Sequence, residues 1–144
     1  MENKTESVKT ESENEKKTLK LKEYMLPDFD RSLNALSKAR LPEKTSYWLA
    51  KKVKAIKKEQ KLFHEIRDEK IKFFSVKDEK GECVANEAGQ ITVDPERTKE
   101  FSESINKLLD TEIDAPEPIK IADLGDKHGL TIEDFLNLEM LISE

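Results

Sequence analysis

Residues 44–74 read KTSYWLAKKVKAIKKEQKLFHEIRDEKIKFF, and this stretch decides the fold. It contains no Gly and no Pro, and good helix formers such as Lys, Ala, Leu and Glu predominate in it. A single helix over this stretch would be about 45 Å long at a rise of about 1.5 Å per residue. Because that length exceeds the diameter of a compact domain of this size, we expect a rod that lies along other elements or projects to a partner.

Apolar residues recur on this predicted helix at intervals of three and four positions, which is typical of coiled-coil-like packing. Polar residues interrupt the pattern at Gln60, Arg67 and Lys70, so a sustained zipper is not expected. The predicted apolar stripe consists of Leu49, Val53, Ile56, Phe63 and Phe74, and it is widened by Tyr47, Trp48, Leu62, Ile66, Ile71 and Phe73.

Three aromatic residues of the rod are our candidates for contact with another copy or another protein. Large aromatic side chains on a partly covered rod make good anchors, because they bury much area with little loss of conformational freedom. We therefore predict partner or self-interaction through Tyr47, Trp48 and Phe74.

A row of lysines lies on a face of the same helix away from the stripe: Lys51, Lys54, Lys58 and Lys61. Such a row can bind the phosphate groups of a nucleic acid. No Gly-rich or aromatic-interleaved basic loop accompanies it, so a solvated helix face is the favoured interpretation.

Composition limits the classes of protein that remain. A chain of 144 residues forms one domain with, at most, a tail. Hydrophobic residues make up 35% and charged residues 40%, so we expect a thin core and charged helix surfaces. The net charge of −5 does not favour bulk binding of nucleic acid.

The charges are unevenly distributed along the chain. Residues 38–72 hold twelve Lys and Arg against five Asp and Glu, whereas residues 78–144 hold six against eighteen. In one interpretation, the acidic part folds back along the basic rod or the charges are solvated faces. In the other, the two halves meet between copies, head to tail, and drive self-assembly.

The predicted fold is α+β and mainly α: a long central helix packed with three shorter helices, plus a small antiparallel β-hairpin. Residues 1–18 are highly charged and predict a disordered tail, and residues 19–144 predict a single mainly helical domain. The elements expected outside the rod are an extended arm at 19–26, a helix at 28–40, a hairpin of 82–85 with 90–93 around a loop at 86–89, a helix from Asp94-Pro95 to about 109, extended segments at 112–114 and 119–122, and a C-terminal helix at 131–142.

The sequence contains no pattern that indicates catalysis. His64 and His128 are the only histidines and Cys83 is the only thiol, which is too few for a zinc cage or a nucleophile with its orienting base. Neither a GxGxxG nor a Walker pattern is present to hold a nucleotide. We expect no enzyme, no catalytic residue, no metal, no cofactor and no small-molecule substrate.

The sequence also gives expectations for the compartment. With Cys83 alone, no intramolecular disulfide can form, which fits a reducing compartment. No run of about 18 apolar residues predicts a membrane helix, and the N-terminus lacks the apolar core of a secretory signal. We expect synthesis in a cytosol without export, and no membrane partner.

A resemblance adds to this interpretation. The order of LPEKTSYWLAKKVKAIKKEQKLFHEIRDEKIKFF, GQITVDPERTKEFSESINKLLDTEID, IKIADL and TIEDFLNLEMLI resembles an uncharacterised family of small helical proteins of tailed bacteriophages and prophages. It covers residues 19–144, and the charged tail departs from it. The resemblance implies a viral accessory or virion protein in the host cytoplasm or in the particle, and it implies no catalytic residue.

Our leading hypothesis is a non-enzymatic bacteriophage protein that acts by protein–protein contacts, as a virion-associated or assembly component. The alternative is a phage-encoded inhibitor of a host defence protein that uses the acidic C-terminal half. The weaker alternative is nucleic-acid binding through the lysine row.

Overall fold

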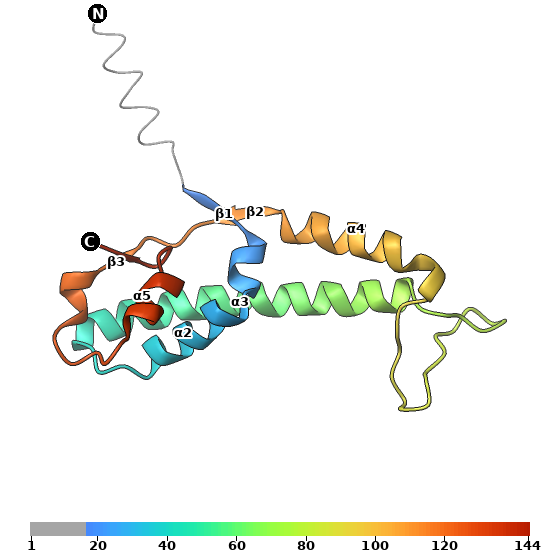
Figure 1. Ribbon diagram of the computed structural model, residues 1–144, viewed down its shortest axis with the longest axis horizontal. Helices are drawn as coiled ribbons and strands as arrows, with labels where there is room; N and C mark the ends of the chain where they lie inside the picture. The colour runs from blue at the N-terminus through green and yellow to red at the C-terminus, as the bar shows by residue number, and fades with distance from the viewer. Residues whose placement is uncertain (1–16) are drawn as a thin grey trace, which may run out of the picture.

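In a computed structural model, which describes residues 17–144, one long helix runs through the whole length of the molecule (Figure 1). This helix, α3 (Glu43–Phe73), has 31 residues and begins directly after Pro42, whose fixed φ suits a helix start. Shorter helices and two small pairs of strands lie along it. The predicted α+β, mainly helical class is therefore confirmed, and so is the long helix, to within one residue at each end.

The remaining elements are short. In chain order they are β1 (Thr18–Lys20), η1 (Leu21–Met25), α2 (Pro27–Ser37), η2 (Pro95–Arg97), α4 (Thr98–Leu109), β2 (Glu112–Asp114), β3 (Ile119–Lys120), η3 (Ile121–Leu124), α5 (Ile132–Asn137) and β4 (Ile142–Ser143). β1 pairs with β2 in an antiparallel two-stranded sheet, with Leu19 opposite Ile113. β3 pairs with β4 in parallel, with Ile119 opposite Ile142.

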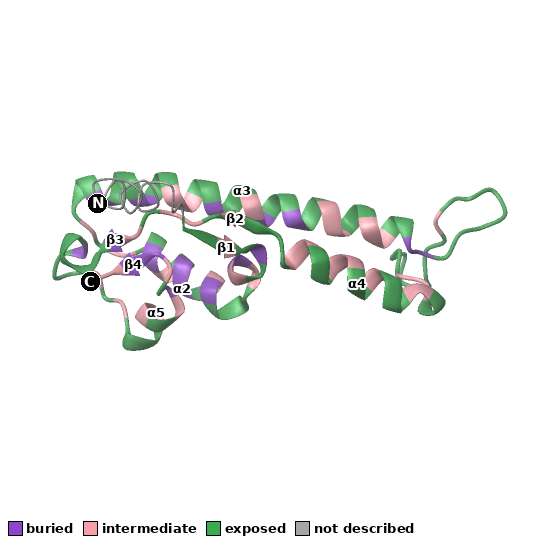
Figure 2. Ribbon diagram, turned by 90° about the horizontal axis from the view of Figure 1, so that it is seen from above, coloured by how far each residue is buried: buried purple, intermediate pink, exposed green. Residues whose placement is uncertain are grey.

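The hydrophobic core lies at one end of α3, where α2, α5 and the C-terminal residues pack on its first half (Figure 2). Side chains from the first and last parts of the described chain meet there, among them Phe29 and Leu36 of α2, Ile56 of α3 and Leu124 of η3. Gln60, which is buried on α3, donates a hydrogen bond of 2.9 Å to the carbonyl of Tyr24 and so ties η1 to the rod.

The second half of α3 is covered on one side by α4, which runs back along it (Figures 1 and 2). Asp94 begins this segment as predicted: its carboxylate accepts a hydrogen bond of 3.0 Å from the Glu96 N–H, which a helix start otherwise leaves free. The rings of Phe74 and Phe101 meet edge to face at 6.1 Å. Lys70 also donates a hydrogen bond to the Ser104 hydroxyl.

Between α3 and α4 the chain forms an exposed arm, residues 75–93, which extends beyond the end of the rod (Figure 1). The hairpin predicted between 82–85 and 90–93 is present only at its tip, where Ala85 bridges Ile91 and a 2.9 Å hydrogen bond from Gly89 N–H to the Asn86 carbonyl closes the loop at 86–89. The rest of the prediction is wrong, because Cys83 bridges Lys77 and Val93 bridges Ser75. The pairing consists of single bridges, since the arm has no core of its own to hold a regular ladder.

The N-terminal expectations need two corrections. The predicted tail covers residues 1–18, of which 1–16 lie outside the described residues, whereas Thr18 pairs with Asp114 and belongs to the fold. The arm predicted at 19–26 is extended only to Lys20 and then turns into η1. A 3₁₀ turn aligns residues three apart, and it therefore buries Leu21 and Tyr24 together.

The C-terminal helix predicted at 131–142 is wrong in its extent. Thr131 caps it, but α5 ends at Asn137. Leu138, Leu141 and Ile142 are then buried in the core. A continued helix would turn some of these side chains outward, whereas the observed turn buries them and lets Ile142 pair with Ile119.

Asp134 joins α5 to α2. One carboxylate oxygen accepts from the Thr131 N–H at 3.1 Å, and the other accepts from the hydroxyl of buried Ser32 at 2.8 Å. The backbone hydrogen bond from Thr131, followed by that of Ser32, lowers the pKa of Asp134. A carboxyl with a lowered pKa in the folded state stabilises the fold above its unfolded pKa, and this contribution disappears as pH falls through the folded value.

We expect Asp134→Asn to lower the free energy of unfolding at pH 7 by about 1–2 kcal/mol, because an amide offers only one acceptor for these two donors. The difference should shrink below the ordinary Asp pKa of about 3.9, where the carboxyl of the unmodified chain also becomes protonated. Urea unfolding at pH 7 and pH 3 measures it, with the exposed Asp126→Asn as the control. An equal gap at both pH values would contradict this role of Asp134.

Candidate protein-interaction site

One edge of α3 carries apolar side chains that nothing in residues 17–144 covers fully. Trp48 is 42% exposed, Leu62 is 49% exposed and Phe73 is 63% exposed. Positions seven apart return to nearly the same side of a helix, so 48, 55 and 62 form one line and 66 and 73 form a second line beside it. We call the set Trp48, Ala55, Leu62, Ile66 and Phe73 the exposed strip.

The strip borders a shallow groove at its C-terminal end, between α3 and α4. This groove has a volume of about 620 Å³ and is lined by Leu62, Glu65, Ile66, Glu69, Lys70, Phe73, Phe74 and Ser104. Apolar carbon forms its floor, and the carboxylates of Glu65 and Glu69 flank it. An apolar floor with a charged rim is the arrangement that protein interfaces use at their centre and edge.

The sequence interpretation missed the character of this strip. Leu62, Ile66 and Phe73 were expected to widen the covered stripe, but Leu62 and Phe73 are exposed. The buried residues of α3 include Leu49, Ile56 and Phe63. Each directly follows a position of the strip, so the buried line lies about a quarter of a turn away from it around the helix. The spacing of seven from 48 through 55 to 62 indicates a second apolar line beside the buried one. The sequence interpretation treated both lines as one broad stripe and therefore did not separate the exposed residues from the buried ones.

The three predicted interaction residues do not come together. Tyr47 and Trp48 are exposed near the start of α3, whereas Phe74 follows its last residue. Phe74 is also buried at 8% exposure: its ring meets Phe73 at 4.9 Å, and the Arg97 guanidinium lies 4.6 Å from the ring centre. Phe74 therefore packs within the chain, and its neighbour Phe73 is the aromatic that faces outward.

The lysine row lies on a fully exposed face of α3, beside the exposed strip. Lys51, Lys54, Lys58 and Lys61 are all exposed. Tyr47 begins the row, with the Lys51 ammonium 4.8 Å from its ring centre. Lys61 makes a weak ion pair of 4.0 Å with Glu65 one turn further along.

The acidic half folds back along the rod without ion pairing to it. Within residues 17–144, no salt bridge joins a Lys or Arg of residues 38–72 to an Asp or Glu of residues 78–144. The contact of α3 with α4 uses aromatic packing and the hydroxyl of Ser104 instead. The four lysines of the row thus face solvent on the folded chain.

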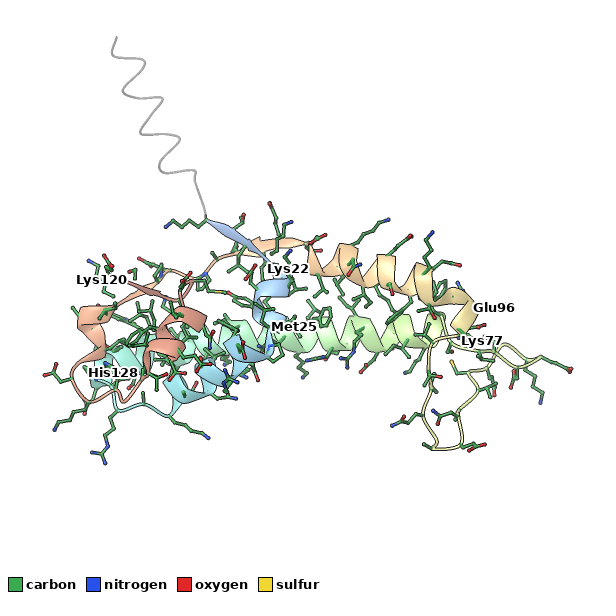
Figure 3. All side chains as sticks on the ribbon, in the orientation of Figure 1. Lys22, Met25, Lys77, Glu96, Lys120 and His128 are labelled. Carbon is green, nitrogen blue, oxygen red and sulfur yellow. The ribbon has the colours of Figure 1, made fainter. Side chains whose placement is uncertain are left out.

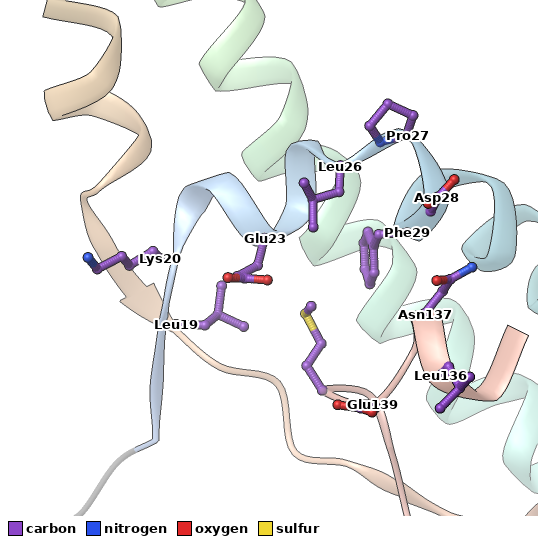
Figure 4. Close-up of a pocket in the computed structure, with 11 residues that line it drawn as sticks. Leu19, Lys20, Glu23, Leu26, Pro27, Asp28, Phe29, Leu136, Asn137 and Glu139 are labelled. Atoms are coloured by element: carbon purple, nitrogen blue, oxygen red, sulfur yellow. The ribbon is translucent and has the colours of Figure 1, made fainter. Parts of the chain in front are cut away.

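A second depression lies between η1, α2 and the C-terminal turn (Figure 4). It has a volume of about 650 Å³ and is lined by Leu19, Lys20, Glu23, Leu26, Pro27, Asp28, Phe29, Leu136, Asn137, Glu139 and Met140. Its lining combines apolar side chains with carboxylates at the rim. It contains no histidine, cysteine or serine, so its side chains do not form a nucleophile–base pair of the usual kind.

The thiol of Cys83 lies at the base of the arm, near Lys77 (Figure 3). The Ser75 hydroxyl donates to its sulfur at 3.2 Å, and the Lys77 ammonium lies 3.4 Å from it. The hydrogen bond from Ser75, followed by the hydrogen bond and charge of Lys77, lowers the pKa of Cys83. Neither histidine contacts this thiol: the ring of His64 meets Phe63 edge to face, and His128 accepts a hydrogen bond from Leu130 N–H.

We expect Ser75→Ala to slow alkylation of Cys83 by iodoacetamide several-fold at pH 7. The thiolate is the reacting form, and each unit of pKa changes its fraction about tenfold below the pKa. The rates of the two proteins should converge at a pH where both thiols are ionised. Equal rates at pH 7 would show that the Ser75 hydroxyl does not stabilise the thiolate. The chain has one cysteine, so the measured rate belongs to Cys83 alone.

The described residues were also compared with known sites and known proteins. In residues 17–144, no group of three or more His, Cys, Asp or Glu side chains is placed to hold a metal ion. No helix among these residues is both long and apolar enough to span a bilayer. The chain matches no protein-family model, and no curated protein or solved structure is significantly similar to it.

Proposed function

We propose that this chain is a non-enzymatic bacteriophage protein that acts through protein–protein contacts, as a virion-associated or assembly component. The observation that carries the proposal is the exposed strip on α3, a line of large apolar side chains on a rigid element. The assignment to a phage rests on the pattern-level resemblance of residues 19–144, and the proposed location is the host cytoplasm or the particle.

Exposed apolar side chains scattered singly are normal, but a group of them indicates a contact surface. Leu62, Ile66 and Phe73 line one groove, and Trp48 lies on the same edge about 21 Å from Leu62 along the helix. Trp48, Leu62 and Phe73 are each at least 42% exposed, although only 35% of this chain is hydrophobic and its core is thin. Complete burial of a large apolar side chain contributes about 1.5–3 kcal/mol, and covering the exposed half of each of these contributes about half of that. A partner that covers the strip would therefore gain substantial binding energy from these three side chains.

Particle incorporation tests the proposal. Phage particles made with the unmodified gene would be purified by density gradient and their proteins quantified by mass spectrometry. We expect the chain to be present at a fixed number of copies, or to be required for particle yield. Trp48→Ala should reduce incorporation or yield, and Leu26→Ala, which removes an equally exposed side chain outside the strip, should not. Absence from particles together with normal yield from a deletion strain would contradict the proposal.

A second candidate is a phage-encoded inhibitor of a host defence protein. It is favoured by the acidic C-terminal half, whose carboxylates make no ion pair with the basic rod in the described residues. The exposed arm carries several of them, including Asp78, Glu79, Glu82 and Glu87. Such a surface fits a basic groove. Stoichiometric capture of one host protein, weakened by salt, would favour this candidate over the first.

Nucleic-acid binding is a weaker candidate that the lysine row supports. Tyr47 at its start could stack on a base, and the four ammonium groups could contact phosphates. Affinity would then fall steeply as salt rises, because bound counterions are released. No binding of a single-stranded oligonucleotide at low salt would eliminate this candidate.

A further inference from the structure

We propose that a second copy of this chain covers the exposed strip, with the two α3 helices packed side by side and antiparallel. This inference rests on the proposed function, in which the chain acts through protein contacts, and it names the partner. Three features of α3 carry it: the spacing of the strip, the order of charges along its edge and the lack of another occupant.

The spacing fits a two-helix seam. Positions 48, 55, 62 and 69 are seven apart, and positions 52, 59, 66 and 73 form a second row of the same spacing, offset by four. The five residues of the exposed strip occupy five of these eight positions, and Lys52, Glu59 and Glu69 occupy the other three. Together the rows repeat at three and four, which is the pattern of the two core positions of a coiled coil. In an antiparallel pair, residues of the row that starts at 48 on one helix face residues of the row that starts at 52 on the partner helix. The register then places Trp48 against the partner's Phe73 and Ala55 against the partner's Ile66.

This register also pairs opposite charges. It brings Lys52 against the partner's Glu69 and Lys58 against the partner's Glu65, and the twofold axis repeats each pair. Lys58, Glu65 and Glu69 are exposed, so they are available for such contacts. Lys51 would face the partner's Lys72 only at the outer ends of the seam, where water and salt screen exposed charges.

A parallel pairing of the same strip is unfavourable. It would place every residue opposite its own copy, so that Lys52 meets Lys52 and Glu69 meets Glu69 across the seam. Like charges at such positions repel and are used against wrong orientations. The residues that flank the strip are basic in the first half of α3 and acidic in the second half. This distribution of charge therefore favours the antiparallel direction.

The chain offers no better occupant of its own. α4 already packs on another side of α3 through Phe101 and Ser104. Residues 112–116 border the seam at positions 52, 55 and 59, but a hollow of about 490 Å³ remains between them and α3. Residues 1–16 contain only Met1 and Val8 as apolar residues, so they cannot supply a matching row of apolar side chains. A second α3 supplies the same row with the complementary order of charge.

A charge exchange tests both the partner and the direction. Lys58→Glu and Glu65→Lys should each weaken self-association about tenfold, because each replaces two attractive pairs by two repulsive ones. The double variant should restore the affinity of the unmodified chain to within a few-fold. The two positions are about 10 Å apart along one helix, so direct pairing within a single chain cannot restore it. Sedimentation equilibrium over a range of protein concentrations measures the dissociation constants.

Two controls match the charge changes without touching the seam. Lys54→Glu lies on the lysine row outside the strip, and Glu79→Lys lies on the arm; both residues are exposed. We expect each control to change the dissociation constant less than threefold. A double variant as weak as the singles, or singles no weaker than their controls, would overturn the inference, as would a chain that stays monomeric. The proposed function fails by a different result, namely absence from particles with normal yield.

Discussion

Phe29→Ala is expected to destabilise the fold by about 3–5 kcal/mol, a large part of the stability of a small domain. Phe29 on α2 is 1% exposed, and its ring stacks on Tyr24 at 5.5 Å. It lies in the cluster that joins α2, α3, α5 and the C-terminal turn, so its removal leaves a cavity where four parts of the chain meet. Urea unfolding followed by circular dichroism measures the loss.

The matched control is Phe73→Ala, the same substitution at a side chain that is 63% exposed. It removes an edge contact with Phe74 and a cation–π contact with Arg97 at 5.2 Å, which together contribute about 1 kcal/mol. Both variants are compared at one dilute protein concentration, where self-association adds little stability. Equal losses for the two variants would contradict the placement of the core at the α2 end of the rod.

Leu62→Glu is expected to convert a self-associated chain into a monomer at micromolar concentration. Leu62 is the exposed apolar residue nearest the middle of α3, and in the antiparallel register it lies beside the twofold axis. The register places the two native Glu59 carboxylates beside this axis, and the substitution adds one more carboxylate from each copy, so four like charges meet there. Burial of unpaired charge costs several kcal/mol, which corresponds to a loss of affinity of at least a hundredfold.

Leu26→Glu is the control for this variant, because Leu26 is 48% exposed and Leu62 is 49% exposed. Leu26 directly precedes α2 and is not one of the seam positions, and an added carboxylate is tolerated at a helix start. Light scattering should give a monomer mass for Leu62→Glu and an unchanged mass for Leu26→Glu. If Leu62→Glu kept the mass of the unmodified chain while the fold stayed intact, the exposed strip would not be the contact surface.

Local patterns predicted the helices well. The absence of Gly and Pro over residues 44–74 gave α3, and Asp94-Pro95 gave the start of the next helical segment. The Thr131 cap was also found, with both halves of its capping box. These features depend only on residues that are close together in sequence, because each backbone hydrogen bond of a helix joins residues four positions apart.

Contacts between distant residues could not be predicted in this way. The parallel pairing of Ile119 with Ile142 depends on how the last residues turn into the core, and the sequence at 131–142 reads equally well as one longer helix. The same limit applies to the site. Phe73 and Phe74 are adjacent in sequence and alike in chemistry, and only the position of α4 decides that Phe74 is buried and Phe73 is exposed.

The measurement to make first is the molar mass of the unmodified chain in solution, by size exclusion with light scattering at low and at high salt. We predict twice 16.6 kDa at low salt, with a shift toward 16.6 kDa as salt rises, because the Lys–Glu pairs at the edge of the strip are screened while the apolar contacts remain. A mass of 16.6 kDa at every salt and protein concentration would contradict self-association through α3.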